Sequence, residues 1–355
     1  MPQENSMEAK LARLLPVKVY RALIRRDVTS FVYHMVSPDS VDYVRHIYPS
    51  KTPEEFEQDL LFIREHFNPV TYGQLLDHTE GRGELPKNAC LLTMDDGYRE
   101  CFTEAAPLLR KHEVPCIFFV TTGFLDNRLM FYRNKYSLCV DAIERLSPTE
   151  GQDLIKGIET SLGHPSQSLE EVLAWLRSLK RADEGNLDQV CSLLGIDIEA
   201  TLRTRSPYLT TGQVKSLLSD GFSIGAHSVR HSKFLDLEQE AIKREILSSC
   251  RVISELSGKN KVPFAFPFSG FGVDRNLLAD LRRNNPEVGI FFDTQGLQPG
   301  EPFIVNRIWA DPPAEQPGSG SNLGELLHEE YQRYVLWRRE YYASMVAYKL
   351  GRQRY

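Results

Sequence analysis

The sequence predicts an α/β protein in which short strands alternate with helices. The strand candidates are short, largely apolar and rich in β-branched and aromatic residues, which is typical of strands buried on both faces. The helix candidates between them carry apolar residues at helical spacing. This alternation predicts a parallel sheet that is covered by helices and is closed or nearly closed. The expected strands are residues 28–36, 89–94, 115–123, 222–227, 262–268, 288–293 and 304–309.

Capping signals give the boundaries of the expected helices. Residues 52–67 begin at Thr52, carry acids in the first turn and repeat apolar residues at helical spacing, so they predict an amphipathic helix. Residues 210–221 open on a Thr cap and close on Gly221. The other helices expected between strands span residues 101–113, 236–258 and 276–284.

The chain divides into one large unit with additions. Its 355 residues allow one domain of about 250 residues with additions, or two domains. Residues 28–311 hold the alternating pattern, and residues 130–205 within them show helical patterns without a convincing strand, so we expect a helical insertion there. A linker rich in Pro, Gly and Ser is expected at 312–324, before a C-terminal helix at 325–355. Residues 1–27 are expected to form an N-terminal helical segment.

Composition excludes several classes of protein. A formal charge of −6 argues against general nucleic-acid binding, which needs a basic face. No apolar run approaches the length of a membrane span, and the first residues lack the apolar region of a secretory signal. The six cysteines show no CxxC pairing. These features predict a cytoplasmic protein with reduced thiols.

Both ends of the chain are basic and apolar, as in "AKLARLLPVKVYRALIRR" near the N-terminus. Such segments can contact a membrane surface or a partner protein. Packing onto the domain is the favoured interpretation, and peripheral membrane contact is the alternative.

Two adjacent acids end the expected strand in "LLTMDDGYRE", residues 91–100. Asp95 and Asp96 can form a turn with Gly97, or they can belong to a site in which one acid holds a cation and the other transfers protons. His227 and His231 follow another strand and lie four residues apart. Because the carboxyl ends of parallel strands meet at one mouth, we expect these groups to lie together. One carboxylate and two imidazoles suit a divalent catalytic metal.

The stretch "LLTMDDGY", followed by "HSVRH", resembles the first two motifs of the polysaccharide deacetylases, the NodB-homology, chitin-deacetylase-like carbohydrate esterases of family 4. The family motifs are Thr-Phe-Asp-Asp-Gly and His-(Ser/Thr)-x-x-His. A third contains Pro-(Tyr/Phe), which "FAFPFSGFG" at 264–272 matches. The resemblance covers roughly residues 28–311. It implies a distorted (β/α) barrel of about seven strands, here with a helical insertion and a C-terminal helix.

The resemblance also implies a role for each residue of the site. Asp95 corresponds to the general base, and Asp96, His227 and His231 correspond to the metal ligands. The expected cofactor is a divalent metal ion, Zn²⁺ in the first place, with Co²⁺, Ni²⁺ or Fe²⁺ as alternatives. The backbone N–H of Phe268, after Pro267, is expected to donate to the oxyanion of the transition state.

The sequence departs from the family pattern in two places. The third motif lacks its usual Arg, so Arg307 could orient the base, or it could form an ordinary salt bridge at the barrel rim. The family's general acid, a His in a late Leu-x-His strand, has no clean match. His328 has the pattern but lies past the linker in a helix, so it is not favoured. His34, at the end of the first strand, is the other candidate for the acid and a candidate for substrate contact, with a buried, hydrogen-bonded His as the alternative.

Three functions follow as hypotheses. The leading one is a metal-dependent hydrolase that removes an acetyl group from an N-acetylated, or less readily an O-acetylated, sugar or glycan precursor. Without a secretion signal, the expected substrate is a nucleotide- or lipid-linked carbohydrate inside the cell. The alternatives are a hydrolase of the same superfamily that attacks another non-peptide C–N bond, such as a formamide or cyclic amide, and an inactive sugar-binding relative.

Overall fold

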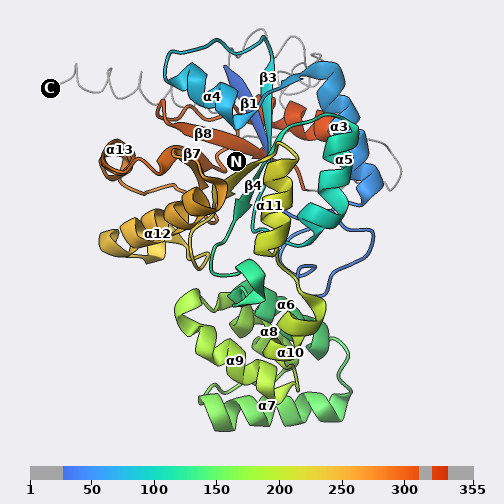
Figure 1. Cartoon of the computed structure of the whole chain (residues 1–355). Coiled ribbons are helices and arrows are strands. Elements are labelled where there is room, and N and C mark those ends of the chain that lie inside the picture. Colours follow the sequence, from blue (N-terminus) through green and yellow to red (C-terminus); the bar gives the residue numbers. More distant parts are fainter. Residues whose placement is uncertain (1–26, 312–321, 335–355) are drawn as a thin grey trace, which may run out of the picture.

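The computed structural model describes residues 27–311 and 322–334. Seven parallel strands form a closed ring in the order β1-β3-β4-β5-β6-β7-β8, with β8 paired back to β1. A two-residue strand, β2, pairs with the start of β3. Figure 1 shows this barrel with its covering helices. The predicted barrel of about seven strands is confirmed. Its strands are β1 (Val28–Tyr33), β2 (Asn68–Pro69), β3 (Ala89–Met94), β4 (Cys116–Val120), β5 (Ser223–Ala226), β6 (Val262–Ala265), β7 (Val288–Asp293) and β8 (Ile304–Trp309).

The barrel is irregular around β6. Only Ala226 and Phe264 pair between β5 and β6, and the register shifts between Val262 and Phe264 where β6 meets β7. Strand β6 ends at Ala265, before the expected end at residue 268. The Phe266 N–H still donates to the Phe292 carbonyl of β7 at 3.0 Å, and residues 267–272 then form a loop at the mouth of the barrel.

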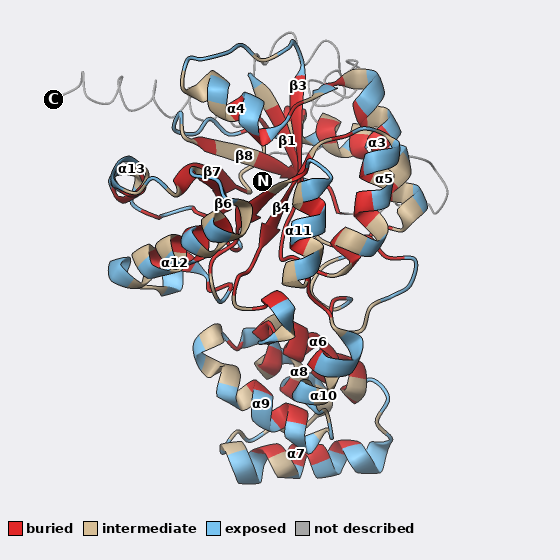
Figure 2. Cartoon of the chain, in the orientation of Figure 1, coloured by how far each residue is buried: buried red, intermediate tan, exposed pale blue. Residues whose placement is uncertain are grey.

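Helices cover the outside of the barrel, with their apolar faces inward (Figure 2). The capping boxes at Thr52 and Thr210 start two of them, as the sequence predicts. A π-helical turn at Cys101–Ala105 precedes α5, so the chain enters that helix through a wider turn. The outer helices are α3 (Pro53–His66), α5 (Ala106–Lys111), α11 (Thr211–Ser219), α12 (Gln239–Ser257) and α13 (Arg275–Asn284), with a short turn η4 (Phe234–Asp236). Helix α4 (Tyr72–Thr79) instead packs through Tyr72 and Leu75 against the interior residues of the barrel.

Strand alternation separates two apolar layers. On β3, Cys90 and Leu92 pack outward against the helices, whereas Ala89 and Leu91 pack in the barrel interior with Phe119 and Phe292. Continuing the inward series beyond Leu91 gives Thr93 and then Asp95. The same alternation that fills the interior with apolar side chains thus brings polar groups to the end of the barrel at which the strands have their carboxyl ends.

Helices between β4 and α11 form a separate lobe, drawn below the barrel in Figure 1. Its own apolar core contains Ile158, Val172 and Val190, and the thiols of Cys139 and Cys191 lie 3.4 Å apart within it. All six cysteines are free and buried. The helices here are η2 (Leu125–Asn127), α6 (Tyr132–Ile143), α7 (Pro148–Leu162), α8 (Leu169–Ser178), η3 (Arg181–Asp183), α9 (Glu184–Leu193) and α10 (Ile198–Arg205).

A further helical segment, residues 323–334, packs against the outer layer through Leu323, Leu327 and Tyr331. The Lys51 ammonium group, fully buried beside Asp59, donates to Asn322 Oδ1 at 2.7 Å and so ties this segment to the loop after β1. No helix within the two described ranges is both long and apolar enough to cross a membrane. The expected N-terminal segment 1–27, most of the linker 312–324 and the later part of the C-terminal helix 325–355 lie outside the described residues.

Candidate active site

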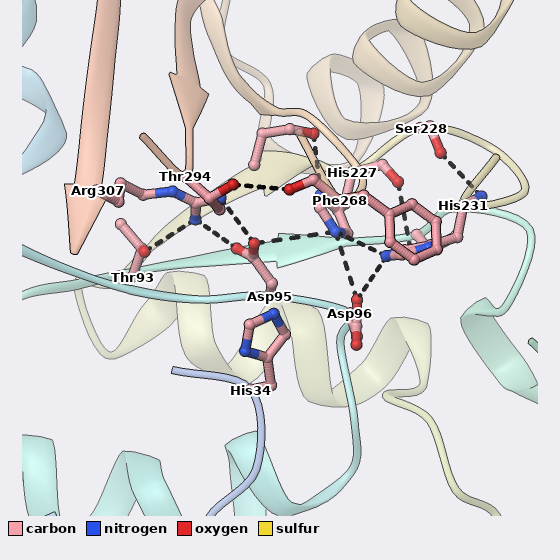
Figure 3. A network of polar contacts seen from close by, with 12 residues as sticks. His34, Thr93, Asp95, Asp96, His227, Ser228, His231, Phe268, Thr294 and Arg307 are labelled. Carbon is pink, nitrogen blue, oxygen red and sulfur yellow. Dashed lines mark hydrogen bonds and ion pairs between the residues drawn. The ribbon is translucent and has the colours of Figure 1, made fainter. Parts of the chain in front are cut away.

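The polar groups singled out in the sequence meet at the carboxyl ends of the strands (Figure 3). Asp95 and Asp96 follow β3, and His227 follows β5. Arg307 extends from β8, and His34 follows β1. Because all these strands are parallel, their carboxyl ends open on one mouth, where catalytic groups of barrel enzymes lie.

Asp96, His227 and His231 form a buried group that could hold a metal ion. Asp96 Oδ1 lies 3.0 Å from His231 Nε2 and 3.4 Å from His227 Nε2, and the two Nε2 atoms are 3.1 Å apart. Among the described residues, Asp96 Oδ1 accepts no hydrogen bond although it is buried. Two imidazole nitrogens and one carboxylate oxygen suit a divalent transition metal with open coordination positions. The donor set therefore fits the expected cation.

Backbone geometry and hydrogen bonds aim these three groups. Asp96 has a φ of 68° and Gly97 a φ of 74°, so the chain turns sharply after Asp95 and brings Asp96 back to the mouth. His231 is also in the left-handed region, and its N–H donates to Ser228 Oγ at 2.9 Å. His227 Nδ1 lies 2.9 Å from the Ala265 carbonyl, which makes Nδ1 the protonated nitrogen and leaves the Nε2 lone pair for a cation. Strained residues of this kind gather at functional sites.

Asp95 is paired with Arg307 instead. The guanidinium donates from Nη1 to Oδ1 at 2.6 Å and from Nη2 to Oδ2 at 2.7 Å, and Nη1 also reaches Thr93 Oγ1 at 3.0 Å. Arg307 is fully buried and lies over the ring of Phe119, 5.3 Å from its centroid. Burial opposes ionisation of Asp95, but the charge and hydrogen bonds of Arg307, together with the nearby His227 and His34, outweigh it and lower the pKa of the carboxyl. Arg307 therefore makes a bidentate pair inside the barrel and not a surface bridge at its rim.

His34 forms a second ion pair at the mouth. Its Nδ1 lies 2.6 Å from Asp311 Oδ2, and its backbone N–H donates to Asp311 Oδ1 at 2.7 Å. Burial disfavours the charged imidazole, but the Asp311 carboxylate, together with those of Asp96 and Asp95, outweighs burial and raises the pKa of His34 to about 9. Its side chain is 16% exposed, against 2% for His227. His34 is thus a partly accessible imidazole with a raised pKa, held beside the Asp311 carboxylate.

The two proposed acids differ in their place in the fold. His34 lies at the mouth, whereas His328 lies in the helical segment 323–334, whose apolar residues Leu327 and Tyr331 pack in the outer layer. The structure thus brings His34, and not His328, next to the other groups of the site.

The loop after β6 brings Phe268 to the cation-binding group. The Phe268 ring lies 5.0 Å from the His231 ring, and Phe268 has a φ of 60°. Its N–H donates to no group among the described residues, so it is available to a substrate. Asp293 holds the loop, because its Oδ1 accepts from Ser269 Oγ at 3.0 Å and from the Gly270 N–H at 2.8 Å.

Comparison with known sequences identifies the family. The sequence profile named "Polysaccharide deacetylase" matches residues 82–167 and 179–286, more than half of the chain. The chain belongs to the polysaccharide deacetylase family. Its matched region contains Asp95, Asp96, His227 and His231.

Individual relatives of this deacetylase-family chain are distant. The poly-β-1,6-N-acetyl-D-glucosamine N-deacetylase of Escherichia coli K12 is 25% identical over 95 residues, which are 26% of this chain and 14% of that protein. This chain therefore aligns with only about a seventh of the curated relative's length.

Solved structures share the fold. The Streptococcus pyogenes deacetylase PplD in complex with acetate has a TM-score of 0.51 at 15% identity, covering 86% of this chain and 97% of that chain. The de-N-acetylase from Aggregatibacter actinomycetemcomitans has a TM-score of 0.51 at 14% identity, covering 84% and 99%. IcaB from Ammonifex degensii has a TM-score of 0.50 at 18% identity, covering 85% and 97%. At these identities, the likeness shows the barrel fold.

Three groups of the site escaped the sequence analysis. Asp311 and Asp293 each follow or end a buried strand, so the rule that placed Asp95 at the mouth could have found them. Tyr48 lies in the long connection between β1 and α3, and its hydroxyl donates to Asp96 Oδ2 at 2.6 Å. Nothing in its sequence surroundings marks it.

Proposed function

We propose that this deacetylase-family chain is a metal-dependent hydrolase that removes the acetyl group from an N-acetylated sugar. The observation that carries the proposal is the different surroundings of two adjacent acids. Asp96 Oδ1 points at two imidazoles, whereas both oxygens of Asp95 are held by Arg307. Asp95 is thereby kept out of the ligand group, 3.9 Å from His227 Nε2, and is available for proton transfer.

The chemistry needs a nucleophilic water, a proton acceptor and stabilisation of an oxyanion. A divalent cation held by Asp96, His227 and His231 would supply polarisation of the acetyl carbonyl and acidification of water. Asp95 takes the proton of the attacking water, a role worth about 10²–10⁴ in rate. Arg307 keeps Asp95 ionised and fixes its orientation, so the carboxylate meets the water in one geometry.

The Phe268 N–H donates to the carbonyl oxygen as that oxygen becomes negative. One such donor is worth roughly 10²–10³ in turnover. Asp293 restrains the loop that carries it, through Ser269 and Gly270. The left-handed conformation of Phe268 turns this N–H out of the sheet pattern.

His34 is the proposed general acid. As the C–N bond breaks, its imidazolium gives a proton to the departing amine nitrogen, and acetate and a free amino sugar result. Asp311 keeps His34 protonated through the pKa near 9, and the partial exposure of the ring leaves it open to a substrate. The acid, the base and the oxyanion donor thus come from β1, β3 and the loop after β6.

The sugar, its carrier and the cation are further parts of the proposal. By its name, the Escherichia coli relative acts on poly-β-1,6-N-acetyl-D-glucosamine, which makes N-acetylglucosamine units the first class to test. The expected cytoplasmic location favours nucleotide- or lipid-linked precursors over a finished polymer. Zn²⁺ is the proposed cation, with Co²⁺, Ni²⁺ and Fe²⁺ as alternatives.

Acetate release tests the proposal directly. The purified chain is incubated with oligomeric, nucleotide-linked and lipid-linked N-acetylglucosamine, with added Zn²⁺ or Co²⁺ and with chelator. We expect acetate from at least one member of the panel, abolished by chelator and by Asp95→Asn. Chelator-resistant release, or release unchanged in Asp95→Asn, would contradict the proposed function.

A further inference from the structure

Tyr48 is not one of the three proposed ligands, but it contacts one of them, Asp96. Its hydroxyl donates to Asp96 Oδ2 at 2.6 Å, on the carboxylate oxygen that faces away from the imidazoles. The other oxygen, Oδ1, is the one that lies 3.0 Å from His231 Nε2. The two oxygens of Asp96 are therefore divided between a protein donor and the expected cation.

Tyr48 is held in place by its neighbours. Its ring packs on the His34 ring with centroids 4.7 Å apart and lies edge-on to Tyr98 at 6.4 Å. Tyr98 is itself fixed by Asn134 of α6, whose Nδ2 donates to the Tyr98 hydroxyl at 2.9 Å and to the Tyr43 carbonyl at 2.6 Å. The helical lobe thus supports the aromatic cluster beneath Asp96.

We propose that Tyr48 is a positioning residue for the cation site. By occupying Oδ2, its hydroxyl presents a single oxygen of Asp96 to the cation and prevents the carboxylate from turning. Groups that orient a metal ligand in this way typically contribute 10–100-fold to metal affinity. The inference rests on the proposed function, since it assumes that Asp96 is a ligand.

The test compares Tyr48→Phe with Tyr43→Phe. Each variant removes one phenol hydroxyl and keeps the ring. Tyr43 belongs to the same aromatic cluster, stacked on Tyr98 at 6.2 Å, but its hydroxyl meets Glu100 at 3.3 Å and not Asp96. Affinity for Co²⁺ is measured by competition with a chelator of known affinity, and the visible Co²⁺ spectrum reports the coordination geometry.

We expect Tyr48→Phe to bind Co²⁺ about 10–100-fold more weakly than wild type, with an altered spectrum, and Tyr43→Phe to match wild type. Thermal unfolding in excess chelator separates this effect from folding, because the cation-free midpoints of the two variants should be similar. Equal Co²⁺ affinity in the two variants would overturn the role of Tyr48. If wild type binds no Co²⁺, Zn²⁺, Ni²⁺ or Fe²⁺, the cation site itself fails, and the Tyr48 inference fails with it.

Discussion

The two sides of the barrel mouth satisfy their charges in opposite ways. On the proton-transfer side, Asp95 is paired with Arg307, and His34 is paired with Asp311. On the cation side, Asp96, His227 and His231 face one another, and Asp96 Oδ1 accepts no hydrogen bond from any described residue. Burying an unpaired charge is unfavourable. On the proton-transfer side the ion pairs neutralise the charges, whereas on the cation side a bound cation would neutralise the Asp96 carboxylate.

This contrast assigns different roles to neighbouring residues. Asp95 continues the inward alternation of β3 and meets Arg307 of β8, whereas the left-handed Asp96 turns toward the loop after β5. Burial works against ionisation of both carboxyls. Arg307 then lowers the pKa of Asp95, while the neighbouring imidazoles of His231 and His227 lower that of Asp96 well below its usual range. Environment, and not residue type, separates base from ligand.

The largest expected effect is loss of the cation. With three protein ligands, the wild-type chain should bind about one divalent ion, and His231→Ala should lose it. Asp96→Asn replaces an anionic ligand with a neutral one and should weaken binding as well. Elemental analysis after gel filtration measures the occupancy. Equal metal occupancy in wild type and His231→Ala would contradict the assignment of His231 as a metal ligand.

The next effect falls on turnover alone. Asp95→Asn removes a proton acceptor and no ligand, so we expect turnover to fall by about 10²–10⁴ while the metal content stays that of wild type. Single-turnover assays with parallel metal analysis test this. Loss of metal in Asp95→Asn and its retention in Asp96→Asn would reverse the two roles. If both variants keep their activity, Asp95 and Asp96 form a structural turn and have no catalytic role.

A smaller effect concerns stability on the proton-transfer side. Arg307→Met leaves the Asp95 carboxylate buried without its partner, which should lower the free energy of unfolding by about 3–5 kcal/mol. Adding Asp95→Asn to Arg307→Met removes the stranded charge and should recover part of the loss. Urea unfolding in excess chelator measures both. An Arg307→Met variant as stable as wild type would mean that the pair contributes little to the fold.

The sequence predicted the residues of the cation side more completely than those of the proton-transfer side. Asp96, His227 and His231 each follow a strand in a dense local motif, and the structure brings them together. The proton-transfer side depends on closure of the barrel, because His34 and Asp311 are separated by 277 residues in sequence and meet only where β1 pairs with β8. That register is a property of the closed sheet, so no local spacing could reveal this pair.

Residues carried by irregular loops were also hard to place at the site from the sequence. Tyr48 reaches Asp96 from a long connection without regular structure, and β6 ends at Ala265, so that the following loop carries Phe268. Hydrophobic periodicity is informative about strands and helices, but it carries no information about where an irregular segment returns to the site. Arg307 is the sequence's substitute for the Arg that the third family motif lacks, and the structure shows its bidentate pairing with Asp95.

The smallest effect, and the one that tests the proton-transfer side most specifically, is a pH dependence carried by His34. Its pKa is raised from the ordinary 6.5 to about 9 in the folded chain, so the folded state holds this proton more tightly than the unfolded state. The stabilisation is therefore complete below pH 6.5 and is lost as the pH rises through about 9. A difference of this size corresponds to at most about 3 kcal/mol.

His34→Gln removes the titrating group while it keeps a polar side chain next to Asp311. The difference in unfolding free energy between wild type and His34→Gln should shrink between pH 6.5 and pH 9, because only the wild type loses a stabilising proton in that range. Groups that titrate in this range away from His34 are common to both proteins and cancel in the comparison. The wild-type rate of acetate release should also decline above about pH 9, as the proposed acid loses its proton. A stability difference that stays constant over this range would show that His34 is neutral in the folded chain, and the proton-transfer side would then lack its acid.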